Sequence, residues 1–387
     1  MASDVLSRPA PPPDMVLSYG PGPEQVADVR LPPLPTGTPP LGAPPIGTSG
    51  GTPLTGTPSA CTPGGALPRG ALPGGALPAG ARPAPLVVFL HGGFWRVAFD
   101  RAHTGPLATA LAAARFAVCV PEFRRTGQRG GGWPGTFDDV AAAVDALPAL
   151  VRDAAGAGRV SDQPALLAGH SAGGHLALWA AARHRLPPDS AWRTPGPRSR
   201  GVVALAAVSD LSACYALGLG QGAAGALLGG GPGQHPERYR AADPTLLLPV
   251  DRPVRLVHGS ADDRVPAGMS HDYVGRACAA GDDAMLDELP GAGHFEVIDP
   301  LSSWWPTAVP QCRSARVGCG IVALLPGRAL TATGQALTPP GRSHVLMPPL
   351  ASSRAAGLLT AARASAFPLG AGNSIYMIMP VQTITWS

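Results

Sequence analysis

A serine lies at the centre of a glycine-flanked motif, residues 169–173 (GHSAG). A serine hydroxyl becomes a strong nucleophile only when a neighbouring base takes its proton. In the pattern G-x-S-x-G, small flanking residues permit the sharp strand-to-helix turn that exposes the serine oxygen. An apolar run over residues 165–168 precedes Ser171, and a helical pattern over residues 173–183 follows it. We therefore predict that Ser171 is a catalytic nucleophile.

A second match to the same pattern tests how specific it is. Residues 47–51 (GTSGG) also fit, but they lie in a Gly/Pro-rich stretch with no strand before them and no helix after. A pentapeptide of this kind arises easily by chance in a glycine-rich chain, so the flanking elements decide. The alternative for Ser171, a serine in an ordinary strand-to-helix turn, stays open.

A carboxylate that orients the base is expected downstream of the serine. In hydrolases of this layout the chain order is serine, acid, histidine. Asp262 follows an expected strand over residues 254–257 and is our predicted acid. Asp263, which could instead begin the next helix, and Asp210, which follows an earlier strand, are the alternative acids.

A histidine that could act as the base follows the last expected strand. His294 lies in a glycine-rich loop directly after residues 284–289, and an imidazole accepts a proton best when a carboxylate orients it. His294 is therefore the predicted base. His258, at the end of a strand, and His271, on a helix, are interpreted as structural.

An acyl-transfer enzyme also needs donors for the oxyanion of its tetrahedral intermediate. One donor is expected to be the backbone N–H of Ala172, the residue after the nucleophile. The others are expected in the loop after the strand over residues 86–90, where Gly92 and Gly93 let backbone N–H groups approach a substrate.

Two aromatic residues follow these glycines. Phe94 and Trp95 are predicted, as one of two alternatives, to line an acyl or aryl pocket, and the other alternative is plain core packing. His91, at the start of the loop, is interpreted as a packing or supporting residue.

Strand and helix patterns alternate along most of the chain. Alternation of this kind predicts βαβ units and a mostly parallel sheet with helices on both faces, and ligands then bind at the carboxyl ends of the strands. Expected strands cover residues 24–32, 86–90, 116–120, 165–168, 202–208, 254–257 and 284–289. Expected helices cover residues 102–114, 136–152, 173–183 and 265–279.

Composition divides the chain into four parts. Residues 1–32 form an N-terminal segment with the first strand, and residues 33–84, rich in Gly and Pro, are predicted to be a disordered insertion. Residues 85–310 form the predicted catalytic domain, with a small glycine-rich cap over about residues 210–248. Residues 311–387 form an atypical tail.

The tail lacks acidic residues. Residues 300–387 contain six Arg and no Asp or Glu, unlike the rest of the chain. Two interpretations stay open: the sequence runs out of frame shortly after Trp304 and Trp305, or the tail is disordered. A closing helix is expected over residues 298–309, and without it the sheet would lack cover on one face.

Charge and cysteine content exclude several functional classes. The formal net charge of +4 comes from the tail, so a nucleic-acid partner is not expected. No apolar run reaches the roughly 18 residues of a membrane span, and the first residues lack the pattern of a signal peptide. The six cysteines form no CxxC pair, which indicates reduced thiols and no zinc site. We expect a cytoplasmic protein with no membrane partner, and its oligomeric state is not predicted.

Taken together, these motifs resemble the α/β-hydrolase fold. The closest resemblance is to a group that includes kynurenine formamidases (arylformamidases) and BD-FAE-like carboxylesterases. The matching segments are residues 91–95 (HGGFW), 169–177 (GHSAGGHLA), 258–266 (HGSADDRVP) and 293–295 (GHF), spread over residues 85–305.

The resemblance implies a serine hydrolase that needs neither a metal nor an organic cofactor. It implies a Ser171–Asp262–His294 triad that cleaves a small-molecule carboxylic ester or a small (aryl)amide or formamide through an acyl-enzyme. The motifs are specific for fold and triad but not for substrate. An exopeptidase-like hydrolase and a non-catalytic protein of the same fold are the alternatives.

Overall fold

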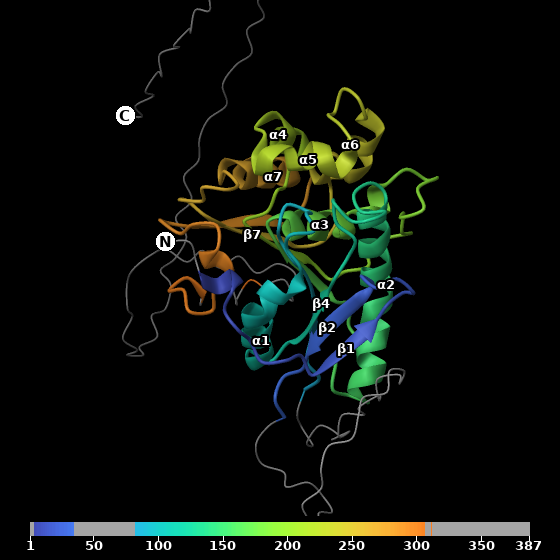
Figure 1. The fold of residues 1–387 in the computed structure, drawn as a ribbon, viewed down its shortest axis with the longest axis vertical. Helices are drawn as coiled ribbons and strands as arrows, with labels where there is room; N and C mark the ends of the chain where they lie inside the picture. Colours follow the sequence, from blue (N-terminus) through green and yellow to red (C-terminus); the bar gives the residue numbers. More distant parts are fainter. Residues whose placement is uncertain (1–3, 35–81, 306–310, 312–387) are drawn as a thin grey trace, which may run out of the picture. The chain divides into compact units, whose positions relative to one another are not determined.

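Eight strands form one sheet in the order β1-β2-β4-β3-β5-β6-β7-β8 (Figure 1). The computed structural model describes residues 4–34, 82–305 and 311. The strands are β1 (Met15–Ser18), β2 (Val26–Arg30), β3 (Leu86–Leu90), β4 (Ala117–Pro121), β5 (Leu166–His170), β6 (Val202–Leu205), β7 (Val254–Gly259) and β8 (Ala284–Leu289). The β1–β2 and β2–β4 pairs are antiparallel, and all pairs from β4 to β8 are parallel.

Helices cover both faces of this sheet. They are α1 (Gly105–Ala113), α2 (Gly135–Ala155), α3 (Ala172–Ala181), α4 (Leu211–Ala216), α5 (Leu219–Leu228), α6 (Pro236–Ala242) and α7 (Gly268–Ala279). Short 3-10 helices are η1 (Asp4–Leu6), η2 (Arg101–Thr104), η3 (Arg183–Arg185), η4 (Pro244–Leu246) and η5 (Glu296–Ile298). In Figure 1, α4, α5 and α6 gather beyond one end of the sheet, where the cap was predicted.

The sheet separates two hydrophobic cores. Along β3, Leu86, Val88 and Leu90 face the core that contains α2, α3 and α7, while Val87 and Phe89 face the core that contains α1, η1 and η5. All five side chains are buried, which explains the uninterrupted apolar sequence of this strand. The α/β-hydrolase fold class predicted from the sequence is confirmed.

Most expected elements are found, but the strand β1 and the helices of the cap were not among the expected elements. The short strand β1 lies between proline-containing segments and pairs with β2 from Met15 opposite Val29 to Ser18 opposite Val26. A four-residue strand carries too little alternation to be recognised from sequence. The glycine-rich cap, for which no helix was expected, contains α4, α5 and α6.

The expected closing helix is wrong for residues 299–304, which form turns. Pro300 disfavours a helical backbone at Asp299, whose ψ of 111° is extended. The Asp299 carboxylate also accepts from Leu301 N at 2.8 Å and pairs with Arg8, which fixes the turn. Residues 306–309 lie outside the described residues.

Two further predictions fall on residues that the structure does not describe. The predicted disordered insertion over residues 33–84 corresponds almost entirely to residues 35–81, and the atypical tail lies beyond residue 311. Both stay predictions, as does the division of the chain into four parts.

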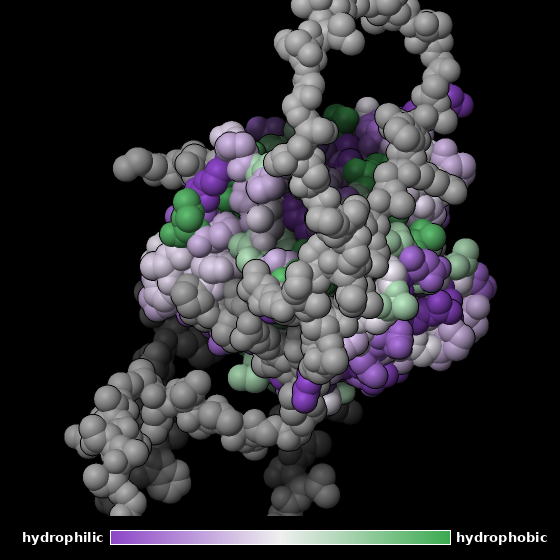
Figure 2. Space-filling model, turned by 90° about the horizontal axis from the view of Figure 1, so that it is seen from below, coloured by the Kyte–Doolittle hydropathy of each residue, from purple (hydrophilic) through white to green (hydrophobic). Residues whose placement is uncertain are grey.

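The visible surface mixes polar and apolar residues. Figure 2 shows a face on which hydrophilic side chains surround scattered hydrophobic ones. Within the described ranges, no helix has both the length and the apolar character needed to cross a membrane.

Candidate active site

Ser171 occupies a strained turn between β5 and α3. Its φ of 55° and ψ of −119° lie where non-glycine residues are rare, and it is only 2% exposed. A Cβ at Gly169 would lie 2.1 Å from the carbonyl oxygen of Gly173, and one at Gly173 would lie 2.0 Å from that of Leu90. At both glycines a backbone carbonyl therefore occupies the space that a Cβ would need, as the predicted sharp turn requires.

The turn is held by β6 and opens α3. Ser171 N donates to Leu205 O at 2.8 Å, and Val208 N donates to Ser171 O at 3.2 Å. Ala172 is the first residue of α3, where backbone N–H groups have no partner within the helix. This position suits the predicted role of Ala172 N as an oxyanion donor.

His294 and Asp262 are in contact although they lie 32 positions apart in the chain. His294 Nδ1 lies 2.7 Å from Asp262 Oδ2, and both side chains are buried. Asp262 also accepts from Val265 N at 2.9 Å and lies 3.1 Å from His258 Nε2. Burial alone would raise the pKa of Asp262, but hydrogen bonds from His258 and His294 lower it well below its usual value. Asp262 is therefore ionised and orients the imidazole of His294.

The alternative acids lie elsewhere. Asp263 is 76% exposed and pairs with Arg264. Asp210 caps α4 by accepting from Ala213 N at 2.7 Å. Neither carboxylate has a hydrogen bond to His294 among the contacts of the described residues.

His258 and His271, which were interpreted as structural, have hydrogen-bond partners of their own. His258 is buried, with Nδ1 2.7 Å from Ser270 Oγ and Nε2 2.9 Å from Val265 O. His271 is exposed and lies 2.8 Å from Glu288. Both arrangements agree with the structural interpretation of these residues.

His170 connects the base to the nucleophile. Its Nε2 donates to the backbone oxygen of His294 at 2.9 Å, and the two rings lie 4.6 Å apart. Burial first, and then the neighbouring His294, lower the pKa of His170 well below the usual value. His170 is therefore neutral, and it anchors the loop of the base beside Ser171.

The predicted oxyanion loop lies against the nucleophile. A Cβ at Gly92 would lie 3.3 Å from Ser171 Cβ and 2.9 Å from His170 Nδ1. Gly93 has a φ of 115°, and a Cβ there would lie 2.4 Å from Phe99 Cβ. Both positions therefore require glycine.

The aromatic residues of this loop have different environments. Trp95 is buried and packs edge-to-face on His175 at 5.2 Å, which favours the core-packing alternative for this residue. Phe94 is partly exposed and its ring lies against Gly220 of the cap. Arg96 donates to Gly220 O at 2.6 Å, so the loop and the cap are joined here. Phe94 stays the candidate pocket residue.

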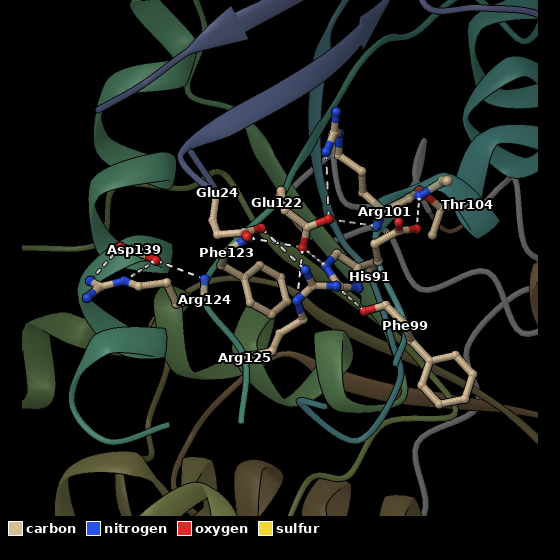
Figure 3. Close-up of polar contacts among 12 residues, drawn as sticks. Glu24, His91, Phe99, Arg101, Thr104, Glu122, Phe123, Arg124, Arg125 and Asp139 are labelled. Carbon is tan, nitrogen blue, oxygen red and sulfur yellow. Dashed lines mark hydrogen bonds and ion pairs between the residues drawn. The ribbon is translucent and has the colours of Figure 1, made fainter. Parts of the chain in front are cut away.

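Sequence reasoning missed a buried polar cluster behind the oxyanion loop (Figure 3). At its centre is Glu122, which follows β4, is 2% exposed and lies 2.9 Å from His91 Nε2. Burial alone would raise the pKa of Glu122, but His91, the backbone N–H of Arg101 and Arg125 lower it to about 2. The sequence signal that could have revealed Glu122 is its place just after the expected strand over residues 116–120.

A metal site does not appear in the described part of the chain. No group of three or more His, Cys, Asp or Glu side chains there is arranged to hold a metal ion.

Comparisons with known proteins indicate the family and the fold. The BD-FAE family model matches residues 76–275, which include Ser171 and Asp262 but end before His294. No curated protein matches the sequence.

Two solved structures, with TM-scores of 0.50 and 0.51, have the same fold. A truncated carbohydrate esterase from gut microbiota is 18% identical with a TM-score of 0.50, covering 61% of this chain and 87% of that one. A bifunctional GH43-CE protein from Bacteroides eggerthii is 19% identical with a TM-score of 0.51, covering 61% of this chain but only 34% of that one. Esterase 2 of Thermogutta terrifontis is 21% identical with a TM-score of 0.46, covering 60% and 83%.

Proposed function

This chain belongs to the BD-FAE family and is an esterase-type hydrolase, and from this premise we propose that it cleaves carboxylic esters or small (aryl)amides, formamides included, through an acyl-enzyme on Ser171. The observation that carries the proposal is the buried 2.7 Å contact between His294 Nδ1 and Asp262, in a loop bonded to His170 beside the nucleophile.

The proposed reaction has two halves. His294 Nε2 takes the hydroxyl proton while Ser171 Oγ attacks the substrate carbonyl carbon, and the N–H groups of Gly93 and Ala172, beside Gly92, bind the oxyanion. The carbon–oxygen or carbon–nitrogen bond then breaks, and the leaving group takes the proton from His294. Water, activated by His294, cleaves the acyl-enzyme and regenerates the serine.

Local electrostatics support these roles. Asp262 stays ionised and accepts a hydrogen bond from the Nδ1–H of His294, which leaves His294 Nε2 as the basic nitrogen. His170 stays neutral, so it adds no positive charge that would make His294 a weaker base. The positive end of the α3 dipole lies at Ser171 and favours negative charge on the intermediate.

The substrate is proposed only as a class. A formyl substrate would need a narrow acyl side and an aromatic leaving-group site, for which Phe94 is the candidate residue. One protein of similar fold is named a carbohydrate esterase, so carbohydrate esters are also candidate substrates. The exopeptidase-like and non-catalytic alternatives have no observation that favours them.

Labelling with a fluorophosphonate probe tests the proposal. We expect the wild type to be labelled and Ser171→Ala to be unlabelled. Ser209→Ala is the matched control, because Ser209 is equally buried but bonds to Met269 O. A folded wild type that is not labelled, or a Ser171→Ala variant that is, would contradict the proposal.

A substrate panel then separates the chemical classes. It contains p-nitrophenyl esters of increasing chain length, an O-acetylated oligosaccharide, N-formylkynurenine and an aminoacyl anilide. Hydrolysis of the anilide alone would favour the exopeptidase-like alternative.

A further inference from the structure

The His91 ring, at the start of the oxyanion loop, is held on both sides. Its Nδ1 lies 2.9 Å from Gly92 O, and its Nε2 lies 2.9 Å from Glu122 Oε1. The ring also stacks on Phe123 at 4.4 Å and is only 1% exposed. The ring is therefore shielded from bulk solvent.

Both partners of His91 are hydrogen-bond acceptors. A peptide carbonyl has no proton to donate, and Glu122 also accepts from the backbone N–H groups of Arg101 and Phe123 and pairs with Arg125, contacts that favour its carboxylate form. A neutral imidazole donates from one nitrogen only. Two acceptors at 2.9 Å therefore require a proton on both nitrogens, which makes the ring a cation.

Other buried histidines of the site differ in this respect. In His258 both acceptors, Val265 O and Asp262, lie at Nε2, whereas Nδ1 faces the hydroxyl of Ser270, which can donate to the ring. His170 faces one carbonyl, and its Nδ1 has no hydrogen-bond partner in the described structure. A neutral ring satisfies both of these arrangements, whereas it does not satisfy the contacts of His91.

Charge balance around Glu122 agrees with a cationic His91. The cluster pairs three cations with three carboxylates: Arg101, Arg125 and His91 with Glu122, Glu24 and Asp28. His103 packs edge-to-face on the His91 ring at 5.8 Å, and burial lowers its pKa to about 4. His103 is therefore neutral and does not compete for the carboxylate.

Glu122 also fixes both ends of the oxyanion loop (Figure 3). One oxygen contacts His91 at the start of the loop, and the other accepts from the backbone N–H of Arg101 at 3.0 Å. Arg125 donates to Phe99 O between these two points. The loop is thus tied to the residues that follow β4.

The contact between His91 and the Gly92 carbonyl also fixes the direction of the Gly93 N–H. In a trans peptide the carbonyl of one residue and the N–H of the next point in opposite directions. The Gly92 carbonyl points at the His91 ring, so the Gly93 N–H points away from that ring. Gly92 itself lies against Ser171.

We propose that His91 is a buried imidazolium which, paired with Glu122, holds the Gly92–Gly93 peptide with its N–H toward the oxyanion and adds positive charge behind it. Both are positioning residues, and the inference rests on the proposed role of Ser171. A preorganised donor of this kind acts on the transition state more than on substrate binding.

Nitrogen NMR of protein labelled in its histidine side chains tests the charge directly. We expect both His91 ring nitrogens to carry protons at neutral pH, in wild type and in Ser171→Ala alike, with His91→Phe providing the assignment. A resonance from an unprotonated His91 nitrogen would overturn the inference. This result does not depend on catalysis, so it separates the inference from the proposed function.

Kinetics tests the positioning role. Glu122→Gln keeps the side-chain size but removes the charge, and we expect kcat to fall about 10- to 100-fold with KM nearly unchanged. The matched control is Asp139→Asn, another fully buried carboxylate that pairs with Arg124 but does not contact the loop.

We expect the control to keep kcat within about twofold of the wild type. An unchanged kcat in Glu122→Gln, or an equal loss in Asp139→Asn, would refute the role. If Glu122→Gln does not fold, the double variant His91→Phe/Glu122→Gln, which removes both buried partners together, gives the same comparison.

Discussion

Replacing Asp262 with Asn tests the proposed acid most sharply. One carboxylate oxygen, Oδ1, accepts from the backbone N–H groups of Arg264 and Val265 at 2.8 and 2.9 Å. The other, Oδ2, faces the ring nitrogens of His294 and His258. An asparagine has a single oxygen, and the two backbone donors hold it at the Oδ1 position.

The amide nitrogen of the variant must then face His294 Nδ1. An NH₂ group is a donor, so His294 presents an unprotonated Nδ1 and carries its proton on Nε2. That tautomer cannot take a proton from Ser171. The same exchange in a serine protease triad lowers kcat by about 10⁴, or about 5.5 kcal/mol at 1.36 kcal/mol per factor of ten.

The assay is kcat on the best ester of the panel, with circular dichroism to confirm folding. Asp263→Asn is the control, because that side chain is 76% exposed, and we expect it to stay within about twofold of wild type. A folded Asp262→Asn variant that keeps more than about a tenth of kcat would refute the assignment of the acid.

Three further predictions use other contacts. Gly173→Ala places a Cβ 2.0 Å from Leu90 O, and we expect the variant to unfold at least about 3 kcal/mol more easily in a denaturant titration. The pKa of Glu122, lowered from 4.5 to about 2, contributes stability that is complete above the unfolded value and is lost as pH falls toward 2. The shift corresponds to about 3 kcal/mol, so acid titration of Glu122→Gln should show a flatter loss over that range. Gly220→Ala would place a Cβ 2.5 Å from the Phe94 ring, and a resulting change in acyl-chain preference on the ester panel would support Phe94 as a pocket residue, whereas an unchanged preference would not.

The strands and the order of the site residues were predictable because their signals are local. Residues 86–90 are apolar at every position because both faces of β3 are covered, and this pattern is visible without any partner. Ser171, Asp262 and His294 each follow a strand at its carboxyl end, and parallel strands bring those ends to one edge.

The contacts that were missed depend on pairing between distant segments. His91 and Glu122 are 31 positions apart, and they meet only because β3 and β4 are neighbours. The role of Trp95 was left open because a buried aromatic and a pocket aromatic have the same local sequence. The closing helix was wrong at Asp299, where Pro300 outweighs the surrounding apolar residues.

The sheet order gives a physical reason for the two carboxylate–histidine pairs. Glu122 follows β4 and Asp262 follows β7, and each of these strands lies two places from β5, which carries Ser171. Two strand spacings are about 10 Å, so a carboxylate at either position reaches the site only through an intervening side chain. A histidine has the required length, and its two nitrogens join a carboxylate on one side to a second group on the other. In our proposals the same device serves two purposes, since His294 accepts the serine proton whereas His91 is charged and orients a donor. In these proposals the second partner is the serine hydroxyl for His294, and for His91 it is the carbonyl of Gly92.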